Sequence, residues 1–479
     1  MLRKKRLIFL EKLFKLKERG TTVRTEIIAG ITTFMAMSYI LMVQPGMFSE
    51  LGNVSYGAIY IATAVSAVVG TLLIGLLANL PLAQASGMGV NAFFVYTVCF
   101  GLGFSYANAL VFVLADGLIF VLLTLTGLRR IVFDAIPKRV KKIIPAGIGL
   151  FIAFLGFQDS GLIINNSATC VGLASFNILG DATWSSIMPL LVTFLTLIGI
   201  GVLSKKKVKG AILWSILGGT VVYYLLGLTI PGFYDGMFSS VSLNPFDAFR
   251  DFGSLAFGKV FTEGFDFSQY LAADGHSIGG LVIAFITTAL AFCMVDMFDT
   301  MGTLYGACRG GNLLVKNEKG EDEVPNMNKA MLADALATCT GAVCGTSTVT
   351  TFVESSAGVA AGGRTGLSAV VTAVMFFIAT FFSPVAALIP ASTYAAALIY
   401  VGILMMSCVK DIQWDNPSVA LPSFLTLAMM PFTYNISYGI AFGLIAHVLI
   451  KVFTGKIKDV KIGTWVITLL FTAMFLLTH

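Results

Sequence analysis

The sequence predicts an all-α polytopic membrane protein whose fourteen transmembrane segments form two inverted repeats of seven. Three observations lead to this fold class: an apolar composition, a series of apolar runs long enough to cross a bilayer, and clusters of basic residues in alternate connections. Of the 479 residues, 57% are hydrophobic and 12% are charged, whereas a typical soluble domain carries about twice that charged fraction. A soluble globular fold is therefore excluded.

Apolar runs, many of them close to the roughly 20 residues that cross a bilayer, set the expected segments. The first seven are expected at 26–45, 57–79, 86–100, 107–127, 143–158, 186–203 and 210–229. The second seven are expected at 278–303, 327–344, 351–361, 366–387, 393–408, 418–433 and 435–453. The apolar stretch 462–478 is short, and the sequence leaves open whether it spans the membrane or lies at its surface.

These runs divide the chain into five parts. They are a basic amphipathic N-terminal segment (1–24), a first repeat (25–229), an extracytoplasmic connector (230–276), a second repeat (277–453) and an apolar tail (454–479). The charges of the N-terminal segment run through its whole length. It is therefore expected to lie on the cytoplasmic membrane surface rather than to be a cleaved signal peptide.

Basic residues test the number of crossings. They cluster at 3–6, 129–142, 205–209, 309–329 and 451–461, with further residues at Arg364 and Lys410. With fourteen spans, all of these lie on the side of the N-terminus, whereas the net acidic connector lies on the opposite side. Cytoplasmic loops are enriched in Lys and Arg, so the sequence predicts a multi-pass protein of the cell membrane with a cytoplasmic N-terminus. This topology explains the formal charge of +6 without a nucleic-acid partner.

Short matches between the two halves indicate a repeat. ITT occurs in the first segment of each half, IPA at the start of each fifth segment, and FLTL in each sixth segment. Since seven is odd, the second copy must enter the membrane from the opposite face. Such an inverted repeat lets a transporter expose one site to the two sides of the membrane in turn.

The third and tenth segments are predicted to be broken into short extended stretches and half-helices. Residues 81–98 open with a proline and small residues, which leaves room for only a short helix. In 341–363, 16 of the 23 residues are Gly, Ala, Ser or Thr, and the β-branched TSTVTTF part favours extended backbone. Such segments at matching places in two halves point to a transporter's binding site. Close helix packing through small residues is an alternative, but it does not explain Glu354.

Four polar residues in these apolar surroundings are candidates for the site: Asp296, Asp299, Glu354 and Asn91. A carboxylate near the centre of a membrane helix costs roughly 2.5–3.5 kcal/mol on insertion scales, so an intramembrane acid predicts function. Asp296 and Asp299 are three residues apart and share one helix face. Glu354 is expected in the first turn of a half-helix, where the helix dipole favours it. The alternatives are headgroup-level positions for the aspartates, a structural hydrogen bond for Glu354 and helix–helix contact for Asn91.

The chemistry of this set suits a planar heterocycle, because carboxylates accept hydrogen bonds and side-chain amides both donate and accept them. Nearby aromatic side chains that could stack on such a ring are Phe93, Phe94, Phe298 and Phe352. A buried carboxylate can also take up and release a proton near neutral pH, which would couple substrate movement to a proton gradient. The sequence has no GxxxxGK[ST] phosphate loop, which excludes ATP hydrolysis by that route, and no cofactor or metal is expected.

Four stretches of the chain resemble the nucleobase:cation symporters of the second (xanthine/uracil permease) family, and within it the Azg-like purine permeases. They are TEIIAGITTFMAMSYILMVQP (25–45), QASGMGVNAFFVYTV (84–98), VDMFDTMGTLYG (295–306) and GTSTVTTFVESSAGVAAGGRTG (345–366). The resemblance covers essentially the whole chain. It implies fourteen spans in two inverted repeats, a core domain and a gate domain, and half-helices at spans three and ten, and it is compatible with a homodimer.

Residue by residue, the resemblance places the family's binding acids on Asp299 and Glu354 and its span-three polar contact on Asn91. Uracil-type members have a histidine where this chain has Thr303, which argues against a pyrimidine substrate. The resemblance implies proton-coupled uptake of a purine base, with guanine or hypoxanthine favoured over adenine. The expected substrate-binding set is Asp299, Glu354, Asn91, Gln44, Thr303, Phe94, Phe352 and Ser355. Glu354, Asp299 and Asp296 are expected to take part in proton coupling, with Asp296 orienting Asp299.

Three other classes of protein are weighed against this interpretation. Intramembrane aspartyl proteases carry their acids on two helices with a GxGD motif, which this sequence lacks, so no enzymatic activity is expected. An anion transporter of the same fold would use half-helix dipoles, and the two acids argue against it. A passive channel would be excluded by concentrative uptake. The sequence leaves open which purine is carried, the oligomeric state and which acid carries the proton.

Overall fold

The computed structural model is predominantly helical and describes residues 10–127, 136–235, 242, 244–272, 277–316 and 322–478. The predicted basic cluster 3–6 lies outside the described residues. So do parts of the predicted basic loops 129–142 and 309–329 and of the predicted connector 230–276.

A helix covers all or part of every predicted segment. The longer helices are α2 (Val23–Met37), α3 (Ile40–Ser49), α4 (Tyr56–Leu73), α6 (Tyr106–Thr126), α8 (Lys138–Asp159), α9 (Trp184–Lys205), α10 (Ala211–Gly227), α14 (Ile278–Gly310), α15 (Met327–Cys344), α17 (Gly366–Ala379), α19 (Ala391–Met405), α20 (Pro417–Phe432), α21 (Ile436–Phe453) and α22 (Ile462–Thr478). Within the described ranges, nine helical stretches are long and apolar enough to cross a membrane.

Polar caps set where several of these helices begin. Thr22 accepts the backbone N–H of Thr25 at the start of α2, at 3.2 Å, and Ser277 caps α14 in the same way. Ser105 and Asn108 form a reciprocal capping box at the start of α6. Such caps satisfy backbone donors that the first helical turn leaves free. Because this information is local, the predicted starts lie within a few residues of the observed ones.

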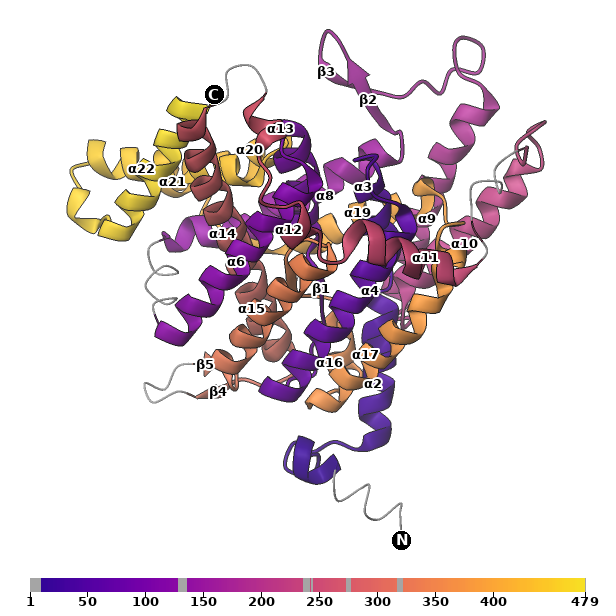
Figure 1. Ribbon diagram of the computed structural model, residues 1–479, viewed down its shortest axis with the longest axis horizontal. Helices are drawn as coiled ribbons and strands as arrows, with labels where there is room; N and C mark the ends of the chain where they lie inside the picture. Colours follow the sequence, from indigo (N-terminus) through magenta and orange to yellow (C-terminus); the bar gives the residue numbers. More distant parts are fainter. Residues whose placement is uncertain are drawn as a thin grey trace.

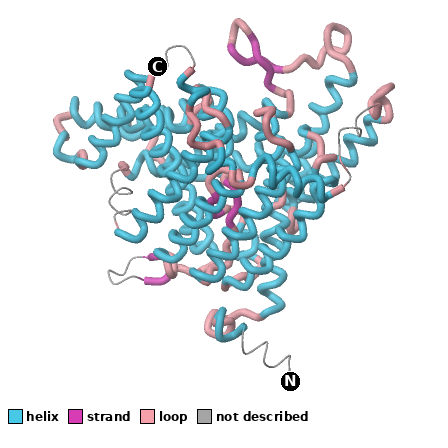
Figure 2. The backbone as a smooth tube through the Cα atoms, in the orientation of Figure 1, coloured by secondary structure: helices cyan, strands magenta, loops and turns pink. Residues whose placement is uncertain are grey.

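Two short strands lie at the centre of the molecule (Figure 2). β1 (Gln84–Ser86) and β6 (Val349–Thr351) form a buried antiparallel pair, with Gln84 opposite Thr351. The chain continues from β1 into α5 (Met88–Ala92) and a π-helix (Phe93–Gly101), and from β6 into α16 (Ser355–Ala360). The third and tenth segments are therefore broken where the sequence predicts, and their extended parts meet.

The helices pack in two groups. In the first, α4 contacts α15 and α17, α2 contacts α17, and α15 contacts α6; the strand pair packs on α4 and α15. In the second, α8 contacts α19 and α20, α20 contacts α21, and α9 contacts α10 and α19. The first group is tight: a Cβ on Gly366 of α17 would lie 1.9 Å from the carbonyl oxygen of Gly75. The helix α22, whose placement the sequence leaves open, packs on α14 and α21.

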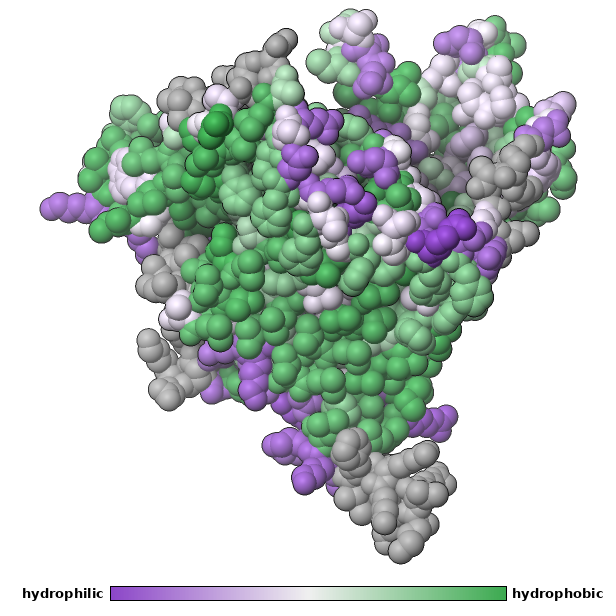
Figure 3. All heavy atoms as spheres, in the orientation of Figure 1, coloured by the Kyte–Doolittle hydropathy of each residue, from purple (hydrophilic) through white to green (hydrophobic). Residues whose placement is uncertain are grey.

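The surface carries an apolar band between two polar ends (Figure 3). A hairpin of β2 (Ile163–Asn166) and β3 (Cys170–Leu173) projects from one end, and β4 (Val315–Lys316) and β5 (Asp322–Glu323) lie at the other, where α2 begins (Figure 1). The β2–β3 hairpin is not predicted from the sequence, because its residues are mostly exposed and show no apolar alternation. The connector contains α11 (Pro245–Asp251), α12 (Lys259–Thr262) and α13 (Ser268–Leu271).

Candidate substrate site

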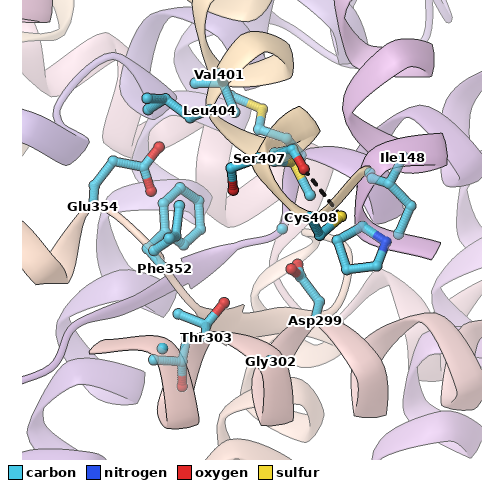
Figure 4. A pocket seen from close by; sticks show the side chains of 18 of the residues that line it. Ile148, Asp299, Gly302, Thr303, Phe352, Glu354, Val401, Leu404, Ser407 and Cys408 are labelled. Carbon is cyan, nitrogen blue, oxygen red and sulfur yellow. Dashed lines mark hydrogen bonds between the residues drawn. The ribbon is translucent and has the colours of Figure 1, made fainter. Parts of the chain in front are cut away.

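A cavity of about 630 Å³ lies between the two groups of helices. One wall comes from α14, β6 and the residues that precede α16, and the other from α8, α19 and the 3-10 helix Met406–Asp411. Small-molecule sites commonly have volumes of about 300–1,000 Å³. Four of the predicted site residues line the cavity: Asp299, Thr303, Phe352 and Glu354 (Figure 4).

Glu354 enters this cavity from the turn between β6 and α16. It is the residue before the first turn of α16, one position earlier than the sequence suggests, and its side chain is 6% exposed. The hydroxyl of Tyr39, which also lines the cavity, donates to Glu354 Oε1 at 2.7 Å. Tyr39 lies at the break between α2 and α3 and is buried. A charge-assisted hydrogen bond of this kind restricts the orientation of the carboxylate.

Asp299 approaches from α14 and is half-buried. Its Oδ2 accepts a long hydrogen bond of 3.4 Å from Thr350 Oγ1 of β6. Gly302, Thr303 and Gly306 follow on the same side of α14 and also line the cavity, as the helical spacing of three, four and seven residues requires. A Cβ on either glycine would meet nothing within 4 Å. The missing side chains therefore leave open space next to Asp299.

Asp296 lies away from the cavity, buried between α14 and its neighbours. Its Oδ2 accepts from Thr338 Oγ1 of α15 at 3.4 Å, and its electrostatic neighbours include Asp116 and Asp334. The side chain that contacts the Asp299 carboxylate is Thr350. Sharing a helix face thus does not place both aspartates in the cavity, because α15 and α6 cover the helix one turn before Asp299.

Asn91 and Gln44 do not line the cavity and instead join the broken segments. Asn91 Oδ1 accepts from Ser86 Oγ at 2.6 Å and from Ser347 Oγ at 2.5 Å, and so links α5 to the residues before β6. Gln44 of α3 donates through Nε2 to Thr346 in the same stretch. Both side chains are completely buried. They therefore hold the strand pair that carries the site.

Ser355 and the predicted aromatic residues of the third segment also lie outside the cavity lining. Ser355 Oγ accepts the backbone N–H of Ala83 at 3.0 Å, which ties the start of α16 to the residues before β1. The Phe94 ring stacks on Phe48 with 4.9 Å between the ring centres, and Phe93 packs edge-on against Phe292. The side chain of Phe298 lies outside the described residues. Phe352 is the predicted aromatic residue that reaches the cavity.

The wall opposite the acids is apolar and the mouth is charged. Ile148 and Ile152 of α8 and Val401 and Leu404 of α19 form the apolar wall. The mouth carries Lys141, Lys142, Arg309, Lys410 and Asp411. The cavity therefore offers hydrogen-bond acceptors on one side, apolar contact on the other and a basic entrance.

At the opposite end of α8, the two helix groups are in contact: Thr97 Oγ1 of the π-helix donates to the backbone carbonyl of Tyr434 at 2.9 Å, and the Tyr96 ring packs edge-on against Tyr434. Tyr96 donates to Glu50 Oε1 at 3.0 Å, and Tyr434 donates to Gln158 at the end of α8. Burial raises the pKa of the Glu50 carboxyl, and the hydrogen bond from Tyr96 opposes that rise. Asp159 is its electrostatic neighbour. In the described residues, the cavity therefore opens at the basic end of α8, whereas contacts between the two helix groups close the opposite end.

Four residues of the site region are not predicted from the sequence: Tyr39, Thr350, Asp116 and Asp334. Asp116 and Asp334 carry the same signal as Asp296, a single acid inside an apolar run (VFVLADGLIF and MLADALA). Tyr39 lies in an apolar run too, inside a stretch that carries the family resemblance. Thr350 has no signal of its own, because its partner Asp299 lies 51 residues away in sequence.

The chain also matches a known protein family and several named relatives. The model of the Permease family (Xan_ur_permease) matches residues 24–442. The chain belongs to the nucleobase:cation symporter-2 family. A putative permease of Methanocaldococcus jannaschii, MJ0326, is 39% identical over 98% of each chain. The adenine permease AdeQ of Escherichia coli is 36% identical, covering 98% of this chain and 96% of the relative. The guanine/hypoxanthine permease PbuG of Bacillus subtilis is 38% identical, covering 93% and 95%.

Family membership makes this nucleobase:cation symporter-2 member a permease and not an enzyme. Solved structures share its fold at low identity. The transmembrane domain of the cyanobacterial bicarbonate transporter BicA is 14% identical with a TM-score of 0.55, covering 88% of this chain and 96% of that one. Murine Solute Carrier 26 family member A9 is 12% identical with a TM-score of 0.58, covering 93% and 72%. The predicted helical membrane-transporter fold is confirmed.

Proposed function

We propose that this permease imports a purine nucleobase together with a proton, with guanine or hypoxanthine favoured over adenine. The observation that carries the proposal is the presence of two carboxylates, Asp299 and Glu354, in one otherwise largely apolar cavity. A purine ring presents several N–H donors at its edge, and carboxylates form strong hydrogen bonds with such donors. Relatives named adenine permease and guanine/hypoxanthine permease support the substrate class.

In this proposal each predicted site residue has a role that matches its position. Glu354 and Asp299 accept N–H groups of the base, Phe352 stacks on its ring, and Thr303 contacts its edge. Asn91, Gln44, Ser355 and Phe94 act through the strand pair and the start of α5 rather than through direct contact. Asp299 and Glu354 also take part in proton coupling, because a carboxyl group that faces the cavity can exchange a proton with the water that fills it.

We further propose the topology and the transport cycle. Fourteen segments form the repeats 25–229 and 277–453, separated by the connector 230–276 and flanked by the N-terminal segment 1–24 and the tail 454–479. The helices around the strand pair act as the core domain and the α8–α19–α20 group as the gate domain. The pairing of β1 with β6, one strand from each half, supports the inverted repeat.

The proposed N-terminus is cytoplasmic, in the cell membrane. Basic residues at the cavity mouth, including Lys142 and Arg309, support a mouth that faces the cytoplasm. The described conformation is then inward-facing, and movement of the core domain against the gate domain exposes the acids to the other side. The family resemblance adds a homodimer to the proposal.

The test is uptake of labelled hypoxanthine by cells that lack their own purine permeases, with and without a protonophore. We expect concentrative uptake that guanine competes and the protonophore abolishes. Competition by adenine alone would retain the mechanism and change the substrate. If no purine is taken up while the protein is in the membrane, the proposal fails, and an anion transporter of the same fold becomes the better hypothesis.

The site is tested in the same cells with Glu354→Gln. Glutamine retains an oxygen that can accept from Tyr39 but lacks the negative charge. A hydrogen bond to a charged group is worth about 1.5–3 kcal/mol, and a neutral one about 0.5–1.5 kcal/mol. We therefore expect uptake to fall by about tenfold or more. The matched control is Glu263→Gln in the exposed connector, which should leave uptake unchanged. Equal uptake by the two variants would refute the role of Glu354.

A further inference from the structure

Behind the cavity, three further carboxyl groups come together in the interior of the first helix group. Asp116 of α6, Asp296 of α14 and Asp334 of α15 are all completely buried, and we call them the buried acid cluster. Thr348 Oγ1 donates to Asp116 Oδ2 at 3.3 Å, and Thr338 Oγ1 donates to Asp296 Oδ2 at 3.4 Å. Both hydrogen bonds are long and therefore weak.

Several acceptor atoms in this region have no donor among the described residues. They are Asp116 Oδ1, Asp296 Oδ1 and Gln84 Oε1. The amide nitrogen of Gln84 donates to Asp334 Oδ1 at 2.8 Å, so the same amide that binds the cluster also presents an unsatisfied oxygen. A buried polar atom without a partner costs about 1–3 kcal/mol, and more for a charged group. Each of these three oxygen atoms lacks a hydrogen-bond donor.

Among the described residues, nothing around Asp116 and Asp296 supplies a balancing positive charge. Within the described residues, the groups that interact with them electrostatically or by hydrogen bonds are carboxyls, hydroxyls and the thiol of Cys293, and none is a lysine, arginine or histidine. The described ranges also contain no group of three acidic, histidine or cysteine side chains that could hold a metal ion. Burying several unpaired carboxylates is strongly unfavourable.

The helices that carry the cluster pack closely beside it. A Cβ on Gly117, next to Asp116, would lie 2.6 Å from Cys339 Sγ and 2.9 Å from the Cys339 backbone nitrogen. The helices α6 and α15 therefore touch directly beside the cluster. A proton is the one cation that needs no additional volume.

The cluster is connected to the substrate cavity through a single strand. Thr348, next to β6, donates to Asp116, whereas Thr350 of β6 donates to Asp299 in the cavity. Asp299 and Asp296 lie one turn apart on α14 and interact electrostatically. A change in the charge of the cluster would therefore act on both β6 and α14, which carry Thr350 and Asp299.

We propose that the buried acid cluster is a second proton-binding site, distinct from the substrate cavity, that holds a proton shared by Asp116 and Asp296. The step that loads it is a proton transfer from the Asp299 carboxyl, which lines the cavity, to the Asp296 carboxylate. One O–H bond breaks and one forms, and the charge moves with the proton. This inference rests on the proposed proton-coupled function and specifies where the coupling proton is stored.

The test uses Asp116→Asn in proteoliposomes that contain a pH-sensitive dye. Asparagine has nearly the same shape and can accept from Thr348, but it cannot bind a proton in this range. We expect hypoxanthine counterflow, which needs no gradient, to be retained, and hypoxanthine-evoked proton uptake and accumulation driven by a pH gradient to be lost. The control is Asp415→Asn, an exposed aspartate, which should retain all three activities.

Two results would overturn the inference: proton uptake by Asp116→Asn at the wild-type level, or loss of counterflow together with coupling. If Asp116→Asn does not fold, Asp296→Asn is measured in the same way.

Infrared spectra of the wild-type protein and of Glu354→Gln give a test without cluster variants. A carboxylic C=O band must be present at neutral pH in both, and its absence refutes the stored proton. Failure of the wild-type protein to exchange hypoxanthine would instead refute the proposed function.

Discussion

Tyr39→Phe is the sharpest single-atom test of how the substrate site is organised. The substitution removes the hydroxyl that donates to Glu354 Oε1 at 2.7 Å and leaves the ring, which is 1% exposed, in place. No apolar contact is lost, and no cavity of side-chain size is created. The effect of the change is therefore confined to the orientation and solvation of the Glu354 carboxylate.

The size of the effect follows from the type of hydrogen bond. Removing one partner of a bond to a charged group costs about 1.5–3 kcal/mol, and each 1.4 kcal/mol corresponds to a factor of about ten in affinity. If the carboxylate orientation is needed only when the base is bound, the KM for hypoxanthine rises by about 10- to 150-fold. Thr350→Val removes only a 3.4 Å contact to Asp299, so its effect should be several-fold smaller.

The assay is the concentration dependence of hypoxanthine uptake, with protein amount and thermal stability measured in parallel. Tyr60→Phe is the matched control, because Tyr60 is also buried and donates at 2.8 Å to the backbone carbonyl of Ala379, away from the cavity lining. It should lower thermal stability without changing KM. An unchanged KM in Tyr39→Phe, in a protein where Glu354→Gln lowers uptake by about tenfold or more, would refute the orienting role of Tyr39.

Other substitutions test the packing, the capping and the closed end of the molecule. Gly366→Ala would place a methyl group 1.9 Å from the Gly75 carbonyl, so we predict loss of folded protein on gel filtration. Glu26→Gln weakens the buried carboxylate that accepts from Ser368 at the start of α17, which should lower unfolding stability by about 1.5–3 kcal/mol. Because burial raises the pKa of Glu50, its contribution to stability falls as pH rises through that raised value, and Glu50→Gln should flatten the pH dependence of thermal unfolding.

Much of the fold could be predicted from the sequence because its determinants are local. Apolar run length defines the helices, and residues such as Thr22 and Ser277 mark their starts. The breaks in the third and tenth segments were visible in the glycine-rich and β-branched composition alone. The pairing of β1 with β6 was not visible, because short strands of 3 residues carry no pairing signal across more than 250 positions.

The acids show the same division between local and tertiary information. The cost of burying a carboxylate in an apolar segment marked Asp296, Asp299 and Glu354 as functional from the sequence, and the same argument applied to Asp116 would have marked it as well. That argument depends on burial and cannot say which acids share a cavity. Asp296 and Asp299, three residues apart, face different surroundings because α15 contacts the side of α14 that carries Asp296 and Thr300, whereas Asp299 lines the cavity.

That this protein is a helical membrane permease could be predicted from the sequence, because hydrophobicity, caps and family motifs are properties of short stretches of chain. Tertiary structure decided which polar groups meet. The contacts of Glu354 with Tyr39, of Asp299 with Thr350 and of Asp116 with Thr348 join residues more than 50 positions apart. Such contacts depend on how the helices pack around the strand pair, and that packing is set by complementary shapes rather than by any local pattern.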